Sequence, residues 1–352
     1  MKITALETRV VELALPRPVK TAIHDMTSVG CVLVTVRAGD VFGEGFCFTL
    51  NGSRIKAFDE MARGFEPFVV GRDIHEIEGI WHDIWVEINP TGQKGVTIGA
   101  LSAIDIALWD AVGKAADLPL HKLFGNCRYD VDTYASSGLW LSATEDELVT
   151  EALAFVEQGF TAIKLRLGRS IDEDVSRVRR VREAIGPDVG LHTDANQGLT
   201  RKHAIRLGRR LEEFNLAWIE EPVAANDLVG HSEVRAALAT PIASGETEYT
   251  RFGMQAMVDA RSADILMPDL QRIGGFSEFR KATAIASANH IPVSSHFFTE
   301  HSLSMAGSLH NCESVEHIDW FAGLFNEQME LTNGKLQIPD RPGTGFTFRQ
   351  GL

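Results

Sequence analysis

The sequence predicts an α/β protein in which a barrel of parallel strands follows a smaller α+β module. Three observations lead to this prediction. Strand-like segments precede helical ones up to about residue 126, whereas short apolar strands alternate with amphipathic helices from about residue 131 onward. The second region holds eight strand candidates separated by helices, the pattern of a parallel β/α barrel. A chain of 352 residues has room for both units.

The N-terminal module begins with β-rich segments and continues with helical ones. The strand candidates are Thr8–Leu15, Cys31–Arg37 and Val41–Phe48, and the helix candidates are Ser53–Val69, Ile74–Ile88 and Gly95–Ala115. The turn Ala38-Gly39-Asp40 joins the second and third strands, which indicates a hairpin. Apolar residues cover most faces of the last helix, and such a helix is buried between layers of a protein.

The barrel region repeats one strand and one helix every two to three dozen residues. Helices such as Glu145–Gln158 and Val175–Ile185 separate the strands. The strand candidates are Asp132–Ser136, Ala162–Leu167, Val189–Asp194, Ala217–Glu220, Ile242–Gly245, Ile265–Pro268, Val293–His296 and Cys312–Glu316. The segment Trp320–Leu352 is rich in Gly and Pro and shows no helical period, so we expect the last outer helix to be missing.

Composition excludes two classes of partner. Forty-eight acidic and 34 basic residues give a net charge of −14, which argues against binding to nucleic acid or to an anionic membrane surface. The N-terminal sequence lacks a signal-peptide pattern, and no run of about 18 uncharged apolar residues predicts a membrane span. We therefore expect a cytoplasmic protein. The four scattered cysteines lack CxxC spacing, which favours small buried apolar groups over metal ligands or disulfides.

Polar residues stand at the carboxyl ends of the barrel strands, at a similar position in each βα unit. Five of them are separated by 26, 26, 23 and 27 residues, and they are Asp194, Glu220, Glu246, Asp269 and His296. Each interval is one βα unit. Active sites of such barrels are built from the ends of several strands, so we expect these side chains to converge on one point.

Three of these residues, Asp194, Glu220 and Glu246, are carboxylates on adjacent strands. Buried together they would repel one another strongly, and a hard divalent cation would remove this conflict. Oxygen ligands with room for water and substrate favour Mg²⁺ over zinc. The alternative is that each acid lies on a solvated loop, which does not explain why three of them share one register.

Two further pairs face the same point. Asp269 beside His296 can fix the imidazole tautomer and raise its basicity, as in an acid–base dyad, although a purely structural hydrogen bond is the alternative. Lys164 and Arg166 share one face of the second barrel strand because side chains alternate along a strand. They could bind a carboxylate, or they could be part of a solvated rim.

These residues and their flanking motifs resemble the enolase superfamily, and within it the mandelate racemase subgroup. The motifs are AIKLRLG, HTDANQG, WIEEPV, SGE, DLQRIGG, SSHFF and VEHID, and the resemblance runs from the N-terminal module to PGTGFTF near the end of the chain. The resemblance implies a modified (β/α)7β TIM-like barrel over residues 127–320 that carries the active site. It also implies an N-terminal α+β capping domain over residues 1–126, to which the tail 321–352 returns.

The resemblance also implies roles for individual residues, with one Mg²⁺ per active site. The metal ligands would be Asp194, Glu220 and Glu246. Lys164 would lie near the substrate carboxylate, and Asn196 near a substrate hydroxyl. The proton-transfer dyad would be His296 with Asp269. Glu316, if protonated, would donate a hydrogen bond to the enediolate oxygen.

Arg166 departs from the family pattern, because mandelate racemase-like proteins commonly have a catalytic lysine there. Racemisation needs a base on each face of a planar intermediate, and an arginine stays protonated in nearly all protein settings. A reaction that His296 can run from one face is therefore favoured. The sequence thus resembles an acid-sugar dehydratase, in which the α-proton is removed and the β-hydroxyl leaves to give a 2-keto-3-deoxy acid.

The segment Val19–Met26 resembles the mobile capping loop of the family. Its polar residues His24 and Asp25 favour a hydroxylated substrate over an aromatic one, and we expect His24 to contact that substrate. An ordinary exposed loop is the alternative. Phe46 and Asn51 are further candidates for the lining of the pocket.

Two other functions stay open. One is a racemase, epimerase or cycloisomerase of the same superfamily, in which Lys164 and His296 would act from opposite faces. The other is a non-catalytic protein that binds small carboxylates. In each case the partner is a small hydroxy-carboxylate, and the family resemblance implies a homo-oligomer.

Overall fold

The computed structural model describes residues 1–352 and contains the predicted barrel. Eight parallel strands follow one another in chain order, and the ring closes where β11 pairs with β4. The strands are β4 Asp130–Ala135, β5 Ala162–Arg166, β6 Gly190–Asp194, β7 Trp218–Glu220, β8 Ile242–Ser244, β9 Ile265–Leu266, β10 Val293–Ser295 and β11 Cys312–His317. All eight predicted strands are confirmed, with ends that differ by at most two residues.

The register of the strands brings the predicted polar side chains together. Asp194 pairs with Arg166 on one side and with Glu220 on the other, at the carboxyl ends of β5, β6 and β7. An isolated parallel bridge joins Asp269 to His296 just after β9 and β10. Because the carboxyl ends of parallel strands lie at the same end of the barrel, these side chains meet at its mouth.

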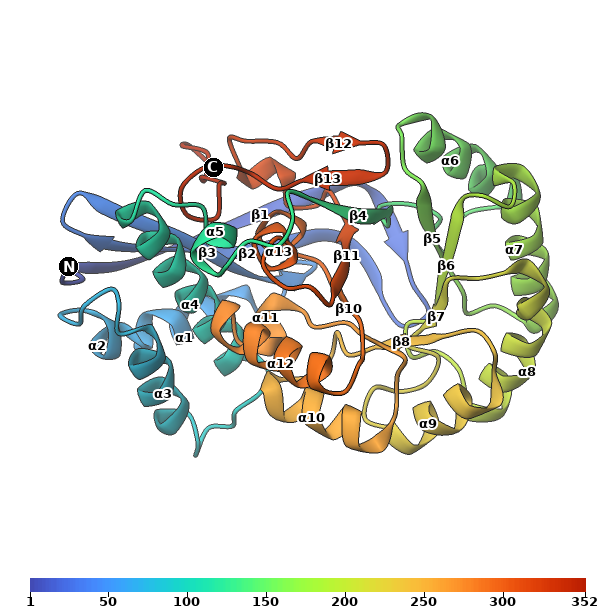
Figure 1. The fold of residues 1–352 in the computed structure, drawn as a ribbon, viewed down its shortest axis with the longest axis horizontal. Coiled ribbons are helices and arrows are strands. Elements are labelled where there is room, and N and C mark those ends of the chain that lie inside the picture. The colour runs from blue at the N-terminus through green and yellow to red at the C-terminus, as the bar shows by residue number, and fades with distance from the viewer.

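Helices lie on the outside of the barrel strands (Figure 1). They are α6 Glu145–Glu157, α7 Ile171–Ile185, α8 Arg201–Leu211, α9 Leu228–Ala237, α10 Thr250–Ala260, α12 Phe276–Ala288 and α13 Thr299–Ala306. The short helix α11 Leu270–Ile273 follows β9 at the mouth of the barrel. Helix α7 begins four residues before the predicted start because Ser170 and Glu173 form a capping box. The side chain of each accepts a hydrogen bond from the backbone N–H of the other.

The N-terminal module is a three-stranded antiparallel sheet covered by helices. The strands are β1 Ala5–Lys20, β2 Asp25–Ala38 and β3 Val41–Leu50, in the order β1-β2-β3. All three are longer than predicted, and β1 continues past Pro16 and Pro18 through an irregularity in its pairing with β2. Figure 1 shows the β1–β2 hairpin extending from the module toward the barrel strands.

The helices of this module are α1 Ile55–Gly64, α2 Glu66–Val69, α3 Ile77–Glu87, α4 Val96–Ala115 and α5 Leu120–Leu123. The prediction of one helix over Ser53–Val69 is wrong, because the chain breaks between α1 and α2. Pro67 lies in the first turn of α2, where a missing N–H costs nothing. Within one continuous helix its ring would clash with the preceding turn.

Helix α4 is buried between the sheet and the barrel, as its apolar composition predicts. It is long and apolar enough to cross a membrane, but 89% of its most apolar window is buried inside the protein. It packs closely on β3, where Gly45 leaves no room for a side chain. A Cβ atom at Gly45 would lie 2.2 Å from the carbonyl oxygen of Ala103.

The chain after β11 has a single 3-10 turn, Ala322–Leu324, in place of the eighth outer helix. Two short strands follow, β12 Leu331–Thr332 and β13 Lys335–Gln337, and β13 pairs antiparallel with β4. Beyond β13 the tail contacts the N-terminal module. The backbone N–H of Thr344 donates to Asp110 at 2.8 Å, and that of Phe348 donates to Glu44 at 3.1 Å.

Candidate active site

A cavity of about 170 Å³ lies at the carboxyl ends of the barrel strands. The segment that joins β1 to β2 covers it, through Thr21, Ile23 and His24. Seven of the ten predicted site residues line this cavity: His24, Lys164, Arg166, Asp194, Asn196, Glu246 and His296. The other three, Glu220, Asp269 and Glu316, are fully buried and contact the lining residues.

Lys164 is the centre of a buried cluster of charges. Its ammonium nitrogen lies 2.9 and 3.0 Å from the two carboxylate oxygens of Glu220 and 2.7 Å from Oε1 of Glu316. Asp194 is farther away, at 3.8 Å. Burial alone would lower the pKa of Lys164, but the charges of Glu220 and Glu316 outweigh it and raise that pKa above its ordinary value. Lys164 is therefore a cation in this arrangement.

Arg166 offers unused hydrogen-bond donors to the cavity. Its guanidinium group lies 4.8 Å above the ring of Trp140, and its Nη2 donates to the hydroxyl of Ser136 at 3.0 Å. Its Nε and Nη1 are buried without a hydrogen-bond partner, although Nε lies 3.5 Å from Oδ2 of Asp194. These free donors suit the oxygens of a bound carboxylate.

His296 and Asp269 form the predicted dyad. Nδ1 of His296 lies 2.8 Å from Oδ2 of Asp269, which makes Nδ1 the donor and leaves Nε2 as the basic nitrogen. Nε2 lies 3.2 Å from Oε2 of Glu246 at the cavity wall. The imidazole stacks on the ring of Phe297, with centroids 4.1 Å apart. Burial alone would lower the pKa of His296, but the charge of Glu246 and the hydrogen bond that His296 donates to Asp269 raise it overall.

Two carboxylates at the mouth, Glu220 and Glu246, have pKa values above their ordinary range. Burial, with repulsion from Asp194, raises the pKa of Glu220 to about 8 in spite of Lys164. Burial, with repulsion from Glu221, raises the pKa of Glu246 to about 7. Oε2 of Glu246 is buried without a hydrogen-bond partner.

This donor set fits a hard divalent cation such as Mg²⁺, whose charge would stabilise the ionised acids. As the side chains are arranged, no three His, Cys, Asp or Glu residues form a group that could hold a metal ion. Neighbouring groups lie against these acids. Lys164 donates to Glu220, the amide of Asn196 donates to Asp194 at 2.9 Å, and Nε2 of His296 lies 3.2 Å from Glu246 without a hydrogen bond.

Glu316 differs from the protonated donor that the family resemblance implies. Its oxygens accept hydrogen bonds from the hydroxyl of Ser136 at 2.6 Å and from the backbone N–H of Phe297 at 2.9 Å. Burial alone would raise the pKa of Glu316, but Lys164 and His296 outweigh it and hold that pKa below its usual range. In this arrangement Glu316 is an ionised acceptor.

Several lining residues escape the sequence argument. They are Leu50, Trp140, Gln197, Glu221, Thr247, Arg272, Phe297 and Trp320, whereas Thr21, Ile23 and Met26 belong to the segment Val19–Met26 already singled out as a capping loop. Arg272 is the clearest omission, because it stands three residues after Asp269 within the motif DLQRIGG. Glu221 directly follows Glu220 and is also fully buried, where burial and repulsion from Asp194 raise its pKa to about 8.

Two candidates for the lining are wrong. Phe46 points into an aromatic cluster, with its ring centroid 4.6 Å from that of Phe298 and 5.1 Å from that of Phe321. The side chain of Asn51 holds the base of the covering loop, since it accepts from the N–H of Thr27 and donates to the carbonyl of Asp25. Neither residue lines the cavity.

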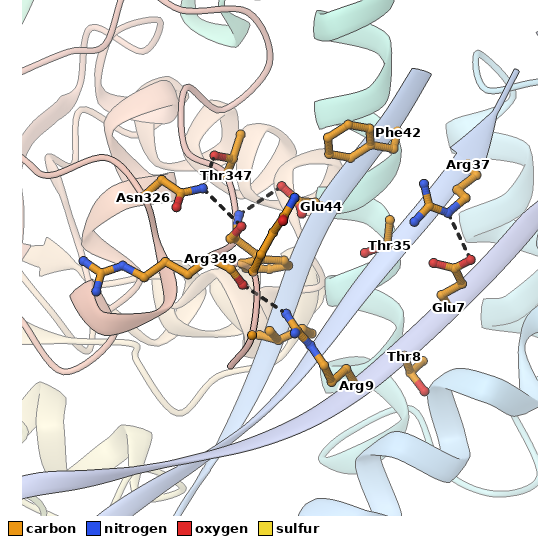
Figure 2. A pocket seen from close by; sticks show the side chains of 14 residues that line it. Glu7, Thr8, Arg9, Thr35, Arg37, Phe42, Glu44, Asn326, Thr347 and Arg349 are labelled. Carbon is orange, nitrogen blue, oxygen red and sulfur yellow. Dashed lines mark hydrogen bonds and ion pairs between the residues drawn. The ribbon is translucent and has the colours of Figure 1, made fainter. Parts of the chain in front are cut away.

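A larger hollow of about 980 Å³ lies elsewhere, between the N-terminal sheet and the tail (Figure 2). Its charged side chains are engaged within the protein: Arg37 donates to Glu7 at 3.0 Å, and Glu44 accepts from the backbone of Phe348. None of the predicted site residues line it. The chemistry-bearing residues gather in the smaller cavity at the barrel mouth.

Two family models match the chain. The model described as enolase C-terminal domain-like matches residues 147–352. The model described as the N-terminal domain of mandelate racemase and muconate lactonizing enzyme matches residues 5–125.

Curated relatives include dehydratases and a cycloisomerase. L-talarate/galactarate dehydratase of Salmonella typhimurium is 37% identical over 92% of this chain and 82% of the relative. The 3,6-anhydro-alpha-L-galactonate cycloisomerase of Streptomyces coelicolor is 35% identical over 94% of each chain. Arabinonate dehydratase of Saccharolobus solfataricus is 31% identical over 94% of this chain and 90% of the relative.

A solved structure with a bound metal has the same fold. L-talarate dehydratase from Polaromonas sp. JS666, complexed with Mg and L-glucarate, superposes with a TM-score of 0.94 at 34% identity. The match covers 99% of this chain and 95% of that one.

Proposed function

Because the chain belongs to the mandelate racemase and muconate lactonizing enzyme family of the enolase superfamily, we propose that it is a Mg²⁺-dependent dehydratase of an acid sugar. In this reaction a base removes the proton α to a carboxylate. The hydroxyl on the β-carbon then leaves as water, and the enol that forms becomes a 2-keto-3-deoxy acid.

The observation that carries the proposal is the asymmetry of the cavity. His296, held by Asp269, presents a basic nitrogen from the end of β10. The end of β5 presents Arg166, which is a poor base because a guanidinium stays protonated. Lys164 next to it is held as a cation by Glu220 and Glu316. A cavity with one base suits β-elimination better than racemisation.

The residues of this chain have distinct tasks in the reaction. Arg166 and Lys164 bind the carboxylate and stabilise the negative charge that develops on it. Nε2 of His296 takes the α-proton, while Asp269 keeps the imidazole oriented and stabilises its charged form. The imidazolium then gives this proton to the β-hydroxyl as the carbon–oxygen bond breaks, so that water leaves. Asn196 binds a substrate hydroxyl.

Three side chains would hold the metal ion: Asp194, Glu220 and Glu246. When bound, Mg²⁺ acts as a Lewis acid toward the substrate carboxylate and adds to the stabilisation of the developing charge. The pKa values of Glu220 and Glu246, raised to about 8 and about 7 mainly by burial, support this assignment.

A screen of acid sugars with Mg²⁺ tests the proposal. The purified protein is incubated with a library of monoacid and diacid sugars, and keto-acid products are detected with semicarbazide. We expect at least one sugar acid to give a keto acid, and we expect a chelator to abolish the reaction. Full activity in the presence of chelator would contradict the metal assignment.

A cycloisomerase or epimerase is the second candidate, since a relative with 35% identity is a cycloisomerase. The same incubation in D₂O separates the two. An epimerase exchanges the α-proton for deuterium without loss of water, whereas a dehydratase releases a keto acid. Binding of Mg²⁺ and sugar acids without exchange or turnover across the library would instead indicate a non-catalytic binding protein.

Family membership leaves the number of substrate carboxylates open. The names of the relatives include galactarate, which carries a carboxylate at each end, and arabinonate, which carries one.

The cytoplasmic location and the homo-oligomeric assembly stay predictions.

A further inference from the structure

The cavity at the barrel mouth has a second cationic side, formed by Arg272. This residue lies on α11, directly after β9, and its side chain lines the cavity. In the eight-stranded ring β9 stands four strands from β5, so the two strands lie on opposite sides of the barrel. Arg166 ends β5 and lines the same cavity. Two guanidinium groups therefore enter the cavity from opposite sides.

Arg272 has donors that the protein does not use. Its Nη1 donates to the backbone carbonyl of Glu246 at 2.9 Å and lies 3.9 Å from Oε1 of the same residue. Its Nε and Nη2 make no hydrogen bond within the protein, and its side chain is 24% exposed. A guanidinium carries five N–H donors, so most of its capacity is free for a ligand in the cavity.

The covering loop adds a polar group on the same side. His24 lines the cavity. Its backbone N–H donates to the hydroxyl of Thr21, whereas its imidazole makes no hydrogen bond within the protein. Burial and the nearby charge of Arg272 both lower the pKa of His24, which favours the neutral imidazole. A neutral imidazole can donate one hydrogen bond to an oxygen.

The acids on this side are already engaged. Glu221 accepts from the amide of Gln197 at 3.0 Å and from the hydroxyl of Thr247 at 3.2 Å. Asp269 accepts from the backbone N–H of Arg272 at 2.9 Å and holds His296. Glu246 is one of the proposed metal ligands, and bound Mg²⁺ would take up its charge.

We propose that Arg272 and His24 form a subsite for a second carboxylate, so that the enzyme prefers diacid sugars to monoacid sugars. This inference rests on the proposed function, in which the carboxylate at the reacting end binds near Lys164 and Arg166. A planar guanidinium matches a carboxylate in shape and charge, whereas the terminal CH₂OH of a monoacid sugar offers it only a neutral hydroxyl.

Matched pairs of sugars test the subsite. Galactarate is compared with galactonate, and glucarate with gluconate, because the members of each pair differ only in the terminal group. Binding is measured by calorimetry in the presence of Mg²⁺, and keto-acid release is measured separately. The wild type should bind at least one diacid about 10- to 100-fold more tightly than its monoacid partner, the range expected for a charged hydrogen bond.

Variants assign the preference to Arg272. Arg272→Gln should remove most of this preference by weakening the binding of diacids much more than that of monoacids, because only diacids lose the charged contact. Both kinds of sugar share the loss of the hydrogen bond from Arg272 to the carbonyl of Glu246. Arg272→Lys keeps a positive charge, so it should retain part of the preference. Arg206→Gln, at an exposed position on α8, is the control and should behave as the wild type. The affinity for Mg²⁺ alone is measured in each variant.

Three results would overturn the subsite. The first is equal affinity of the wild type for both members of every pair, and the second is an equal loss of affinity for diacid and monoacid in Arg272→Gln. The third is a loss of Mg²⁺ affinity in Arg272→Gln that accounts for the whole loss of diacid binding. Tight diacid binding that depends on Arg272, without keto-acid release from any sugar, would leave the subsite in place and contradict the proposed dehydratase. Turnover of monoacids and diacids at equal rates and affinities would contradict the subsite alone.

Discussion

Glu300 is a buried carboxyl group that the proposed reaction does not use. It lies on α13, is 1% exposed, and neither of its carboxylate oxygens has a hydrogen-bond partner. Burial raises its pKa to about 7 from an ordinary value of 4.5. The folded protein therefore holds the proton of Glu300 more tightly than the unfolded chain does.

This difference predicts a pH-dependent stability. The contribution of Glu300 is fully present below pH 4.5 and is lost as the pH rises through about 7, because the folded state must then bury a charge. Glu300→Gln removes the titration. At pH 8 the variant should be more stable than the wild type by up to about 3 kcal/mol, at 1.36 kcal/mol per pKa unit, and the difference should shrink toward pH 4.5.

Urea unfolding at pH 5 and pH 8 measures this effect. Glu313→Gln, at an exposed position on β11, is the control and should change stability by less than about 0.5 kcal/mol at both pH values. A difference between Glu300→Gln and the wild type that stays constant with pH would contradict the account of Glu300.

At the residue scale, the three proposed metal ligands, the His296–Asp269 dyad and the Lys164–Arg166 pair could be predicted from the sequence alone. Each of these residues stands at or just after the end of a barrel strand, at a similar position in its βα unit. It missed Arg272 because this residue lies on a short helix after its strand. It placed Phe46 wrongly, because the register of a strand determines which face a side chain takes and the sequence alone does not fix that register.

Among the secondary structure elements, the contact between β3 and α4 most clearly depends on a single residue. Gly45 allows the strand to approach the helix backbone, since a Cβ atom there would lie 2.2 Å from Ala103 O and 2.8 Å from Ala107 N. Backbone atoms cannot move aside as a flexible side chain can. The close packing of β3 on α4 therefore requires glycine at this position.

Gly45→Ala should destabilise the protein by about 1–3 kcal/mol or more through overpacking. Gly64→Ala is the matched control, because a Cβ atom at Gly64 would meet nothing within 4 Å. Thermal melting of both variants tests this contact. A melting temperature of Gly45→Ala equal to that of Gly64→Ala would show that α4 can shift away from β3 at little cost.

The barrel strands could be predicted because they are short apolar segments separated by amphipathic helices at a regular interval. The boundaries of β1 and α1 could not. β1 extends through two prolines because its pairing with β2 is irregular between Ala14 and Val19, where both prolines lie. The break at Phe65 depends on how Pro67 starts α2, and hydrophobic periodicity alone does not show it.

For the whole molecule, part of the acidic charge lies at the barrel mouth, where Asp194 and Glu220 end β6 and β7 and Glu246 follows β8. A ligand that binds only the folded state stabilises it, by about 2.7 kcal/mol at a concentration 100 times the dissociation constant. We therefore expect Mg²⁺ to raise the melting temperature of the protein.

The substitution Glu246→Gln should reduce this shift, because it removes one of the three proposed charges, while Glu313→Gln should leave it unchanged. The measurement is a thermal melt with and without Mg²⁺ at constant ionic strength. A shift of equal size in the wild type and in Glu246→Gln would place the binding of Mg²⁺ elsewhere in the molecule.

The central claim for the whole molecule is that the fold brings His296 to a substrate as the base that starts dehydration. The most direct test compares the rate of keto-acid formation by the wild type and by His296→Asn, with Mg²⁺ and the best substrate from the screen. The account predicts a fall in kcat of about 10²- to 10⁴-fold, the usual contribution of a general acid–base group. A variant that forms the keto acid at the wild-type rate would contradict it.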